Sequence, residues 1–161
     1  MSNDADLVRR FHSGESAAFE TIVSAHQDDI YTLCLRVLGS ITVAEAVAES
    51  IFITAHQAMH RLNPETPIRP WLLQLAVDDL SDRTSEDDAG SEAPHAQSAQ
   101  LNGLLQRLDM PFRLAVILRD VIGIEPTEIA EILQIPIGTA HSRVHRARLT
   151  MARSLNEHGE G

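Results

Sequence analysis

The sequence has no lysine, one cysteine and only six aromatic residues among its 161 residues. A single cysteine excludes an intramolecular disulfide and a cysteine-based zinc site. No apolar run approaches the ~20 residues that a transmembrane helix needs, and the acidic N-terminus lacks the apolar core of a signal peptide. Aliphatic residues are plentiful, whereas runs of β-branched residues are almost absent. We therefore expect a cytoplasmic, all-α protein that does not insert into a membrane.

Charge is distributed unevenly along the chain. The 13 basic residues are all arginine, and 23 acidic residues give a formal net charge of −10. Residues 1–96 carry this whole excess, and residues 97–161 are neutral. An acidic protein repels nucleic acid overall, so any DNA contact must be local. Such a protein is expected to bind DNA weakly alone and to need a larger partner to bring it there.

Helical periodicity occurs in two parts of the chain, separated by residues 84–99. That segment carries four acids, no arginine, and alanine as its only apolar residue type apart from one proline. It cannot bury enough apolar surface to offset the entropy of ordering, which predicts a flexible linker. The sequence thus predicts two small helical domains, 1–83 and 100–161, joined by a flexible acidic linker. Thr42 and Glu45 have the spacing of a capping box, which would begin one helix of the first domain.

The stretch from Glu125 to Asn156 predicts a helix-turn-helix. Pro126 suits the first position of a short helix, and Pro136 ends that helix because proline disfavours the helical conformation of the residue before it. In the longer helix that follows, one face is apolar at steps of four, three and four residues, formed by Ala140, Val144, Ala147 and Met151. The opposite face carries His141, Ser142, His145, Arg146 and Arg153, with Arg143 and Arg148 on its flanks.

Two interpretations of this pair of helices remain at this point. In a helix-turn-helix the second helix enters the major groove of DNA and the first crosses the backbone. In an ordinary helical hairpin the basic face would only be solvated. The four arginines between Ile137 and Asn156, with no acid among them, favour DNA binding.

The C-terminal part resembles the extracytoplasmic-function group of bacterial RNA polymerase sigma factors, which have only regions 2 and 4. The sequence L-R-D-V-I-G-I-E-P-T-E-I-A-E-I-L-Q-I-P-I-G-T-A-H-S-R-V-H-R-A-R is similar to the family pattern L-R-x-x-x-G-x-S-x-x-E-I-A-x-x-L-G-x-P-x-G-T-V-x-S-R-L-x-R-A-R. The resemblance implies that this part is region 4, which reads the promoter −35 element and rests on the polymerase β-flap. The residues expected at DNA are Thr139, His141, Ser142, Arg143, His145, Arg146 and Arg148.

The N-terminal part resembles sigma region 2 more loosely. V-A-E-A-V-A-E-S-I-F is similar to the family segment that docks on the polymerase β′ clamp helices, which implies polymerase binding by Glu45, Glu49 and Phe52. After Trp71 the family tends to have arginines that serve in melting and capture of the −10 element, whereas this chain has Asp78 and Asp79. An acid in place of a phosphate contact adds repulsion, so −10 recognition is expected to be impaired. Gln134 also replaces the glycine of the helix-turn-helix turn, which costs up to ~1 kcal/mol if that residue needs a positive φ.

The sequence therefore predicts a sigma factor that directs RNA polymerase to promoters, with core polymerase, promoter DNA and an anti-sigma factor as partners. One alternative is a sigma-like regulator with impaired −10 function that binds an anti-sigma factor or polymerase without productive initiation. Another is a helix-turn-helix repressor that acts alone as a dimer. No cofactor, metal or enzymatic activity is predicted, because the pairs His56/His60 and His141/His145 have no third ligand nearby in sequence and no nucleophile or glycine-rich phosphate loop is present.

Overall fold

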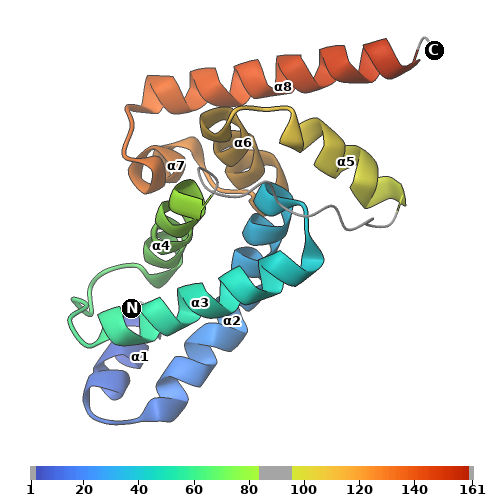
Figure 1. Ribbon diagram of the computed structural model, residues 1–161. Helices are drawn as coiled ribbons and strands as arrows, with labels where there is room; N and C mark the ends of the chain where they lie inside the picture. Colours follow the sequence, from blue (N-terminus) through green and yellow to red (C-terminus); the bar gives the residue numbers. More distant parts are fainter. Residues whose placement is uncertain (1–2, 84–95, 160–161) are drawn as a thin grey trace.

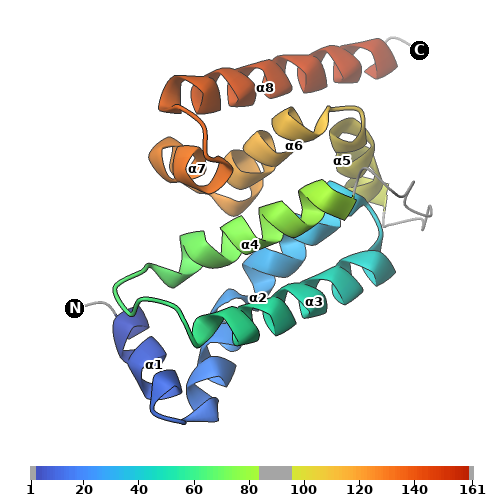
Figure 2. The ribbon, with the colours of Figure 1, turned by 60° about the vertical axis from the view of Figure 1, so that its left-hand side comes forward.

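The computed structural model describes residues 3–83 and 96–159, which fold entirely into helices and turns (Figures 1 and 2). The prediction of an all-α fold is confirmed. The N-terminal helices are α1 (Asn3–His12), α2 (Ser16–Leu38), α3 (Ile41–Met59) and α4 (Ile68–Arg83). The C-terminal helices are α5 (Ala96–Gln106), α6 (Met110–Val116), the π-helical segment η1 (Ile117–Ile122), α7 (Pro126–Leu133) and α8 (Ile137–Gly159).

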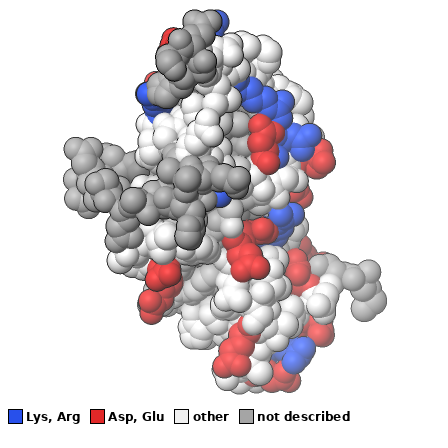
Figure 3. Space-filling view, turned by 90° about the vertical axis from the view of Figure 1, so that its right-hand side faces the viewer, with Lys and Arg blue, Asp and Glu red and all other residues white. Residues whose placement is uncertain are grey.

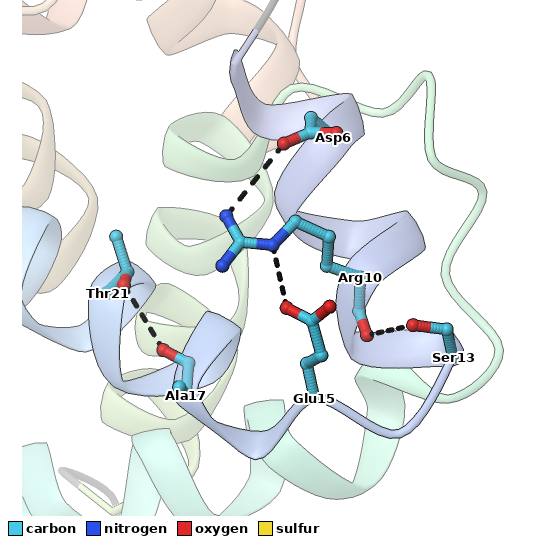
Figure 4. A network of polar contacts seen from close by, with 6 residues as sticks. All are labelled: Asp6, Arg10, Ser13, Glu15, Ala17 and Thr21. Atoms are coloured by element: carbon cyan, nitrogen blue, oxygen red, sulfur yellow. Dashed lines mark hydrogen bonds and ion pairs between the residues drawn. The ribbon is translucent and has the colours of Figure 1, made fainter.

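The N-terminal helices pack around α2, which contacts α1, α3 and α4. Polar contacts fix the tight turn between α1 and α2 (Figure 4). There, Arg10 Nε donates to Glu15 Oε2 at 2.8 Å, and Ser13 Oγ donates to the Arg10 carbonyl at 2.8 Å. The largest side chains on the inner faces are completely buried, among them Ile22, Leu33, Ile51, Met59, Leu72 and Leu80.

The start of α3 differs from the predicted capping box. The N-cap is Ser40, whose hydroxyl accepts from the Val43 backbone N–H at 3.3 Å, so Thr42 already lies within the helix. Gly39 ends α2 in the left-handed conformation at φ 77°, which lets α3 begin two residues later. The cap therefore falls on the first suitable side chain after this turn.

Helix α5 begins earlier than the sequence predicts, whereas α7 and α8 keep the predicted boundary. Helix α5 starts at Ala96, so the last four residues of the predicted linker 84–99 are helical, and the rest of it (84–95) lies outside the described residues. Helix α6 continues directly into η1, whose wider turn ends at Gly123 with φ 89°. Helices α7 and α8 then follow with the predicted boundary at Pro136. None of the described helices is both long and apolar enough to cross a membrane.

The C-terminal helices pack directly on the N-terminal ones. Helix α7 lies on α4, and both η1 and α5 contact α2 (Figures 1 and 2). One continuous hydrophobic core joins the two groups and includes Leu72 and Ile30 on one side and Leu118 and Ile129 on the other. Arg69 on α4 bridges the groups, because it pairs with Asp29 of α2 at 2.9 Å and donates to the Ile122 carbonyl at 3.4 Å.

The turn between α7 and α8 requires a left-handed residue, and that residue is Gln134 at φ 56° and ψ 50°. Among the described residues it is the only one other than glycine with a positive φ. Its backbone N–H bonds to the Glu131 carbonyl at 3.3 Å, and Ile135 N–H bonds to the Ala130 carbonyl at 2.9 Å. These bonds complete the end of α7. They also hold Gln134 in a left-handed conformation that is strained for any residue with a side chain.

We expect Gln134→Gly to raise the free energy of unfolding by about 0.5–1 kcal/mol, because glycine removes the left-handed strain at a smaller entropic cost. Urea unfolding followed by circular dichroism measures the change. Gln100→Gly within α5 is the matched control and should lower stability by about the same amount. A loss of stability in Gln134→Gly would contradict the assignment of strain to this residue.

Candidate nucleic-acid interface

Helix α8 separates an apolar face from a polar one, as its periodicity predicts. Ala140, Val144 and Ala147 are buried against α6 and α7, and Met151 is partly buried. On the other face His141, Ser142, His145, Arg146 and Arg153 are all exposed. Thr139 and Arg143 are half-buried at the edges. The structure thus presents five of the seven residues expected at DNA as exposed side chains and two as partly covered ones.

Arg146 is oriented by an aromatic ring from α6. Its guanidinium carbon lies 5.1 Å from the centre of the Phe112 ring, within the range of a cation–π contact. The two side chains line a small hollow between the α5–α6 turn and α8, together with Arg107, Asp109 and Thr150. This contact restricts the Arg146 side chain without burying its charge, so its donors stay available to a ligand.

Arg148 has a different environment, because it forms an ion pair with Asp120 of η1. Arg148 Nε donates to Asp120 Oδ2 at 2.8 Å, and Nη2 bonds to the other carboxylate oxygen. The hydrogen bond from Arg148 holds the pKa of the Asp120 carboxyl below its usual range. A phosphate would therefore have to compete with Asp120 for this guanidinium. Sequence reasoning missed Asp120 and Phe112, because both act through contacts between separate helices.

Charge is distributed in space as it is along the chain. On the face shown in Figure 3, acidic side chains dominate the lower part, formed by the N-terminal helices, whereas most of the basic ones gather in the upper part near α8. From Ile137 to Asn156, α8 carries four arginines and no acid, and the first acid on the helix is Glu157. A polyanion is therefore attracted to this surface more than to the acidic N-terminal helices.

The three residues expected to bind polymerase lie in one groove. Glu45, Glu49 and Phe52 of α3 line it with Tyr31 and Gln27 of α2, and its volume is about 370 Å³. Glu45 and Glu49 are exposed at its edge, and Phe52 is half-buried. The α2 residues could not be found from sequence, because their share in the groove depends on how α2 and α3 pack.

A second groove lies between α3 and α4 and is acidic. Asp78, Asp79 and Asp82 line it, and Ile51 and Leu75 form its apolar part. Asp79 pairs with Arg83, the last residue of α4, which partly neutralises it. The sequence has acids in α4 where the resembling family tends to have arginines. In the structure these acids line one groove and give it an acidic surface.

Possible metal ligands do not converge. His56 and His60 lie against Phe11, with ring centres 5.3 and 4.8 Å from it. Within residues 3–83 and 96–159, no group of three or more histidine, cysteine, aspartate or glutamate side chains could hold a metal ion.

Comparison with known proteins shows what this chain resembles. The family model for sigma-70 region 4 matches residues 98–151, which span α5 to most of α8. The extracytoplasmic-function RNA polymerase sigma factor SigW of Bacillus subtilis is 28% identical, with 93% of this chain and 95% of SigW covered. Over nearly its whole length, the chain is thus similar to extracytoplasmic-function sigma factors, and its residues 98–151 match sigma-70 region 4.

Two solved structures share the fold of this chain. The structure of CnrH in complex with the cytosolic domain of CnrY has a TM-score of 0.86 at 22% identity, and covers 97% of this chain and 99% of that one. The sigma factor RpoE in complex with the anti-sigma factor NepR, from Bartonella quintana, has a TM-score of 0.77 at 18% identity, with 86% and 96% covered. Both likenesses extend over the N-terminal and C-terminal helices, so the resemblance is not confined to region 4.

We expect Asp120→Asn to lower the free energy of unfolding at pH 7 by about 0.2–1 kcal/mol, because the pair with Arg148 is partly exposed. The folded-state pKa of Asp120 is lowered, so this contribution is present above the ordinary carboxyl pKa and is lost as the pH falls through the folded value. Urea unfolding at pH 7 and near pH 3 measures both effects. The difference in free energy of unfolding between wild type and Asp120→Asn should be smaller near pH 3 than at pH 7. Asp28→Asn on α2 is the control, and a pH-independent difference would contradict the ion-pair account.

Proposed function

We propose that this sigma factor directs RNA polymerase to specific promoters and that α7 and α8 recognise the −35 element. The single observation that carries this is the exposed basic face of α8, which has no acid from Ile137 to Asn156, on an otherwise acidic protein. Because the rest of the molecule repels DNA, this face contacts the duplex when polymerase supplies most of the affinity. The sigma factor contributes selectivity, and the polymerase supplies catalysis.

The roles of the α8 residues follow from their chemistry. His141, Ser142 and His145 can donate hydrogen bonds to base edges in the major groove, and Arg146 can bond a guanine or a phosphate. Thr139, near the start of α8, and half-buried Arg143 are suited to the backbone. Arg148 contributes positive potential while paired with Asp120, and contacts a phosphate only if that pair rearranges.

Polymerase binding is assigned to two surfaces. We propose that the groove of Glu45, Glu49 and Phe52 receives the β′ clamp helices, because it combines an aromatic floor with an acidic edge and so fits a helix carrying apolar and basic side chains. The C-terminal helices rest on the β-flap. We further propose that residues 1–83 and 100–161 are the two domains that make these contacts.

The acidic groove between α3 and α4 sets a limit on −10 recognition. Asp78 is exposed and Asp79 is half-buried where single-stranded DNA would pass, and each adds repulsion to a phosphate backbone. Promoter choice therefore depends on the −35 element more than on α4. We also propose an anti-sigma factor as partner, which the complexed state of the RpoE structure supports. The protein acts in the cytoplasm, without an enzymatic activity or cofactor of its own.

Arg146→Ala is expected to weaken binding of the assembled holoenzyme to its promoter by ~1–3 kcal/mol, because it removes a contact to a base or phosphate. Fluorescence anisotropy with labelled promoter DNA measures the change. Arg153→Ala, two turns further along the same exposed face, is the matched control and should change binding by less than ~0.5 kcal/mol. Equal effects of the two substitutions would contradict a specific role for Arg146.

Glu49→Arg is expected to weaken binding to core polymerase roughly tenfold, since it places a cation where the groove is proposed to meet basic groups. Titration of labelled protein with core enzyme measures the dissociation constant. Glu20→Arg, an exposed charge reversal on α2 outside the groove, should leave it unchanged. Unchanged binding in Glu49→Arg would exclude this groove as the polymerase contact.

A further inference from the structure

The continuous segment formed by α6 and η1 contacts two arginines of α8 in different ways. Phe112, near the start of α6, places its ring beneath the Arg146 guanidinium, with 5.1 Å between the guanidinium carbon and the ring centre. Asp120 of η1 instead pairs with Arg148 through hydrogen bonds to both of its carboxylate oxygens. One segment therefore acts on both arginines, through a ring in one case and a carboxylate in the other.

The two contacts leave the arginines with different donors available. A guanidinium carries five N–H donors in one plane. In Arg148, Nε and Nη2 are already bonded to Asp120. An aromatic ring attracts a cation through the negative potential of its face and takes up no hydrogen bond. Arg146 is thus held in place with its donors available, whereas Arg148 has to break bonds to Asp120 before a ligand can use these donors.

The Phe112 ring is itself a fixed support. It is half-buried and packs against the hydrophobic core, whereas the Arg146 side chain that it contacts is exposed. The two side chains meet in the hollow between the α5–α6 turn and α8, which Thr150 also lines. Because packing anchors the ring, the contact transmits the position of α6 to a long side chain on the outer face of α8.

We propose that Phe112 is a positioning residue for promoter recognition, which holds Arg146 in the conformation that binds the −35 element without touching DNA itself. This inference rests on the proposed recognition of that element by α8. Ordering a long side chain on binding costs affinity, and a side chain that is ordered beforehand avoids most of this cost. Without the ring, Arg146 keeps its charge and loses its fixed direction.

The test uses holoenzyme assembled from the full chain and core polymerase. The probe is a labelled DNA fragment that wild-type holoenzyme has selected from a library with a randomised −35 element. Phe112→Leu should bind this fragment roughly two- to tenfold more weakly than wild type, which corresponds to the ordering of one long side chain. Phe112→Tyr keeps an aromatic ring and should bind like wild type.

The matched control is Phe19→Leu, which removes another half-buried aromatic side chain, near the start of α2. Phe19 packs on Phe11, with 6.0 Å between the ring centres, and not on an arginine of α8. Its replacement should leave binding to the selected fragment unchanged.

Two further variants separate positioning from an ordinary structural role. In an Arg146→Ala background, Phe112→Leu should have no additional effect, because the ring acts through Arg146. Pentafluorophenylalanine in place of Phe112 keeps the approximate shape of the ring and reverses the charge distribution of its face, so it should weaken binding as Phe112→Leu does. A merely structural role predicts additive effects of the two substitutions and normal binding by the fluorinated protein.

Either of these last two results would overturn the proposal, and so would equal binding by Phe112→Leu and wild type. Circular dichroism establishes that each variant keeps its helix content. If Phe112→Leu does not fold, the comparison of the fluorinated protein with Phe112→Tyr decides the question. If wild-type holoenzyme selects no −35 sequence, the proposed function fails and this inference with it. If selection succeeds and the fluorinated protein binds normally, the inference alone fails.

Discussion

The packing of the C-terminal helices on α2 depends on one constraint, which is that the last carbonyls of α2 need hydrogen-bond donors. Gly39 satisfies Leu35 through its backbone N–H, and the following carbonyls are satisfied by Gln106 and Arg113. Because these donors come from α5 and α6, completing one helix also positions the other half of the chain. In the same arrangement α7 packs on α4, and the polar face of α8 is exposed.

Charge then determines what the exposed surfaces can do. From Ile137 to Asn156 the outer face of α8 has arginines and histidines without acids, while the N-terminal helices carry the net negative charge. A duplex is attracted to one helix and repelled by most of the remaining surface. The same distribution makes the Glu45–Phe52 groove suited to a basic protein partner and α4 unsuited to DNA. Electrostatics alone therefore favours the proposed division of labour with polymerase.

The parts of the structure that depend on local sequence could be predicted, and the parts that depend on distant contacts could not. Periodicity predicted the buried face of α8, and Pro136 predicted its start, because both effects act within a few residues. The cap at Ser40 was missed because two nearby hydroxyl residues, Ser40 and Thr42, could serve, and α3 begins directly after Ser40, two residues beyond the left-handed Gly39. The start of α5 at Ala96 was missed because an alanine- and glutamine-rich segment favours a helix once Leu101 and Leu105 have a surface to pack on. The Asp120–Arg148 pair links residues 28 apart and has no local signal.

The central claim is that the basic face of α8 selects a promoter only as part of a polymerase complex. Run-off transcription with purified core polymerase tests it most directly, using promoter fragments with an intact or a scrambled −35 element. The account predicts one specific transcript that requires both the protein and the intact −35 element, and no specific binding of the free protein to the same DNA. A protein that binds polymerase yet yields no specific transcript, or that binds the promoter tightly without polymerase, would contradict it.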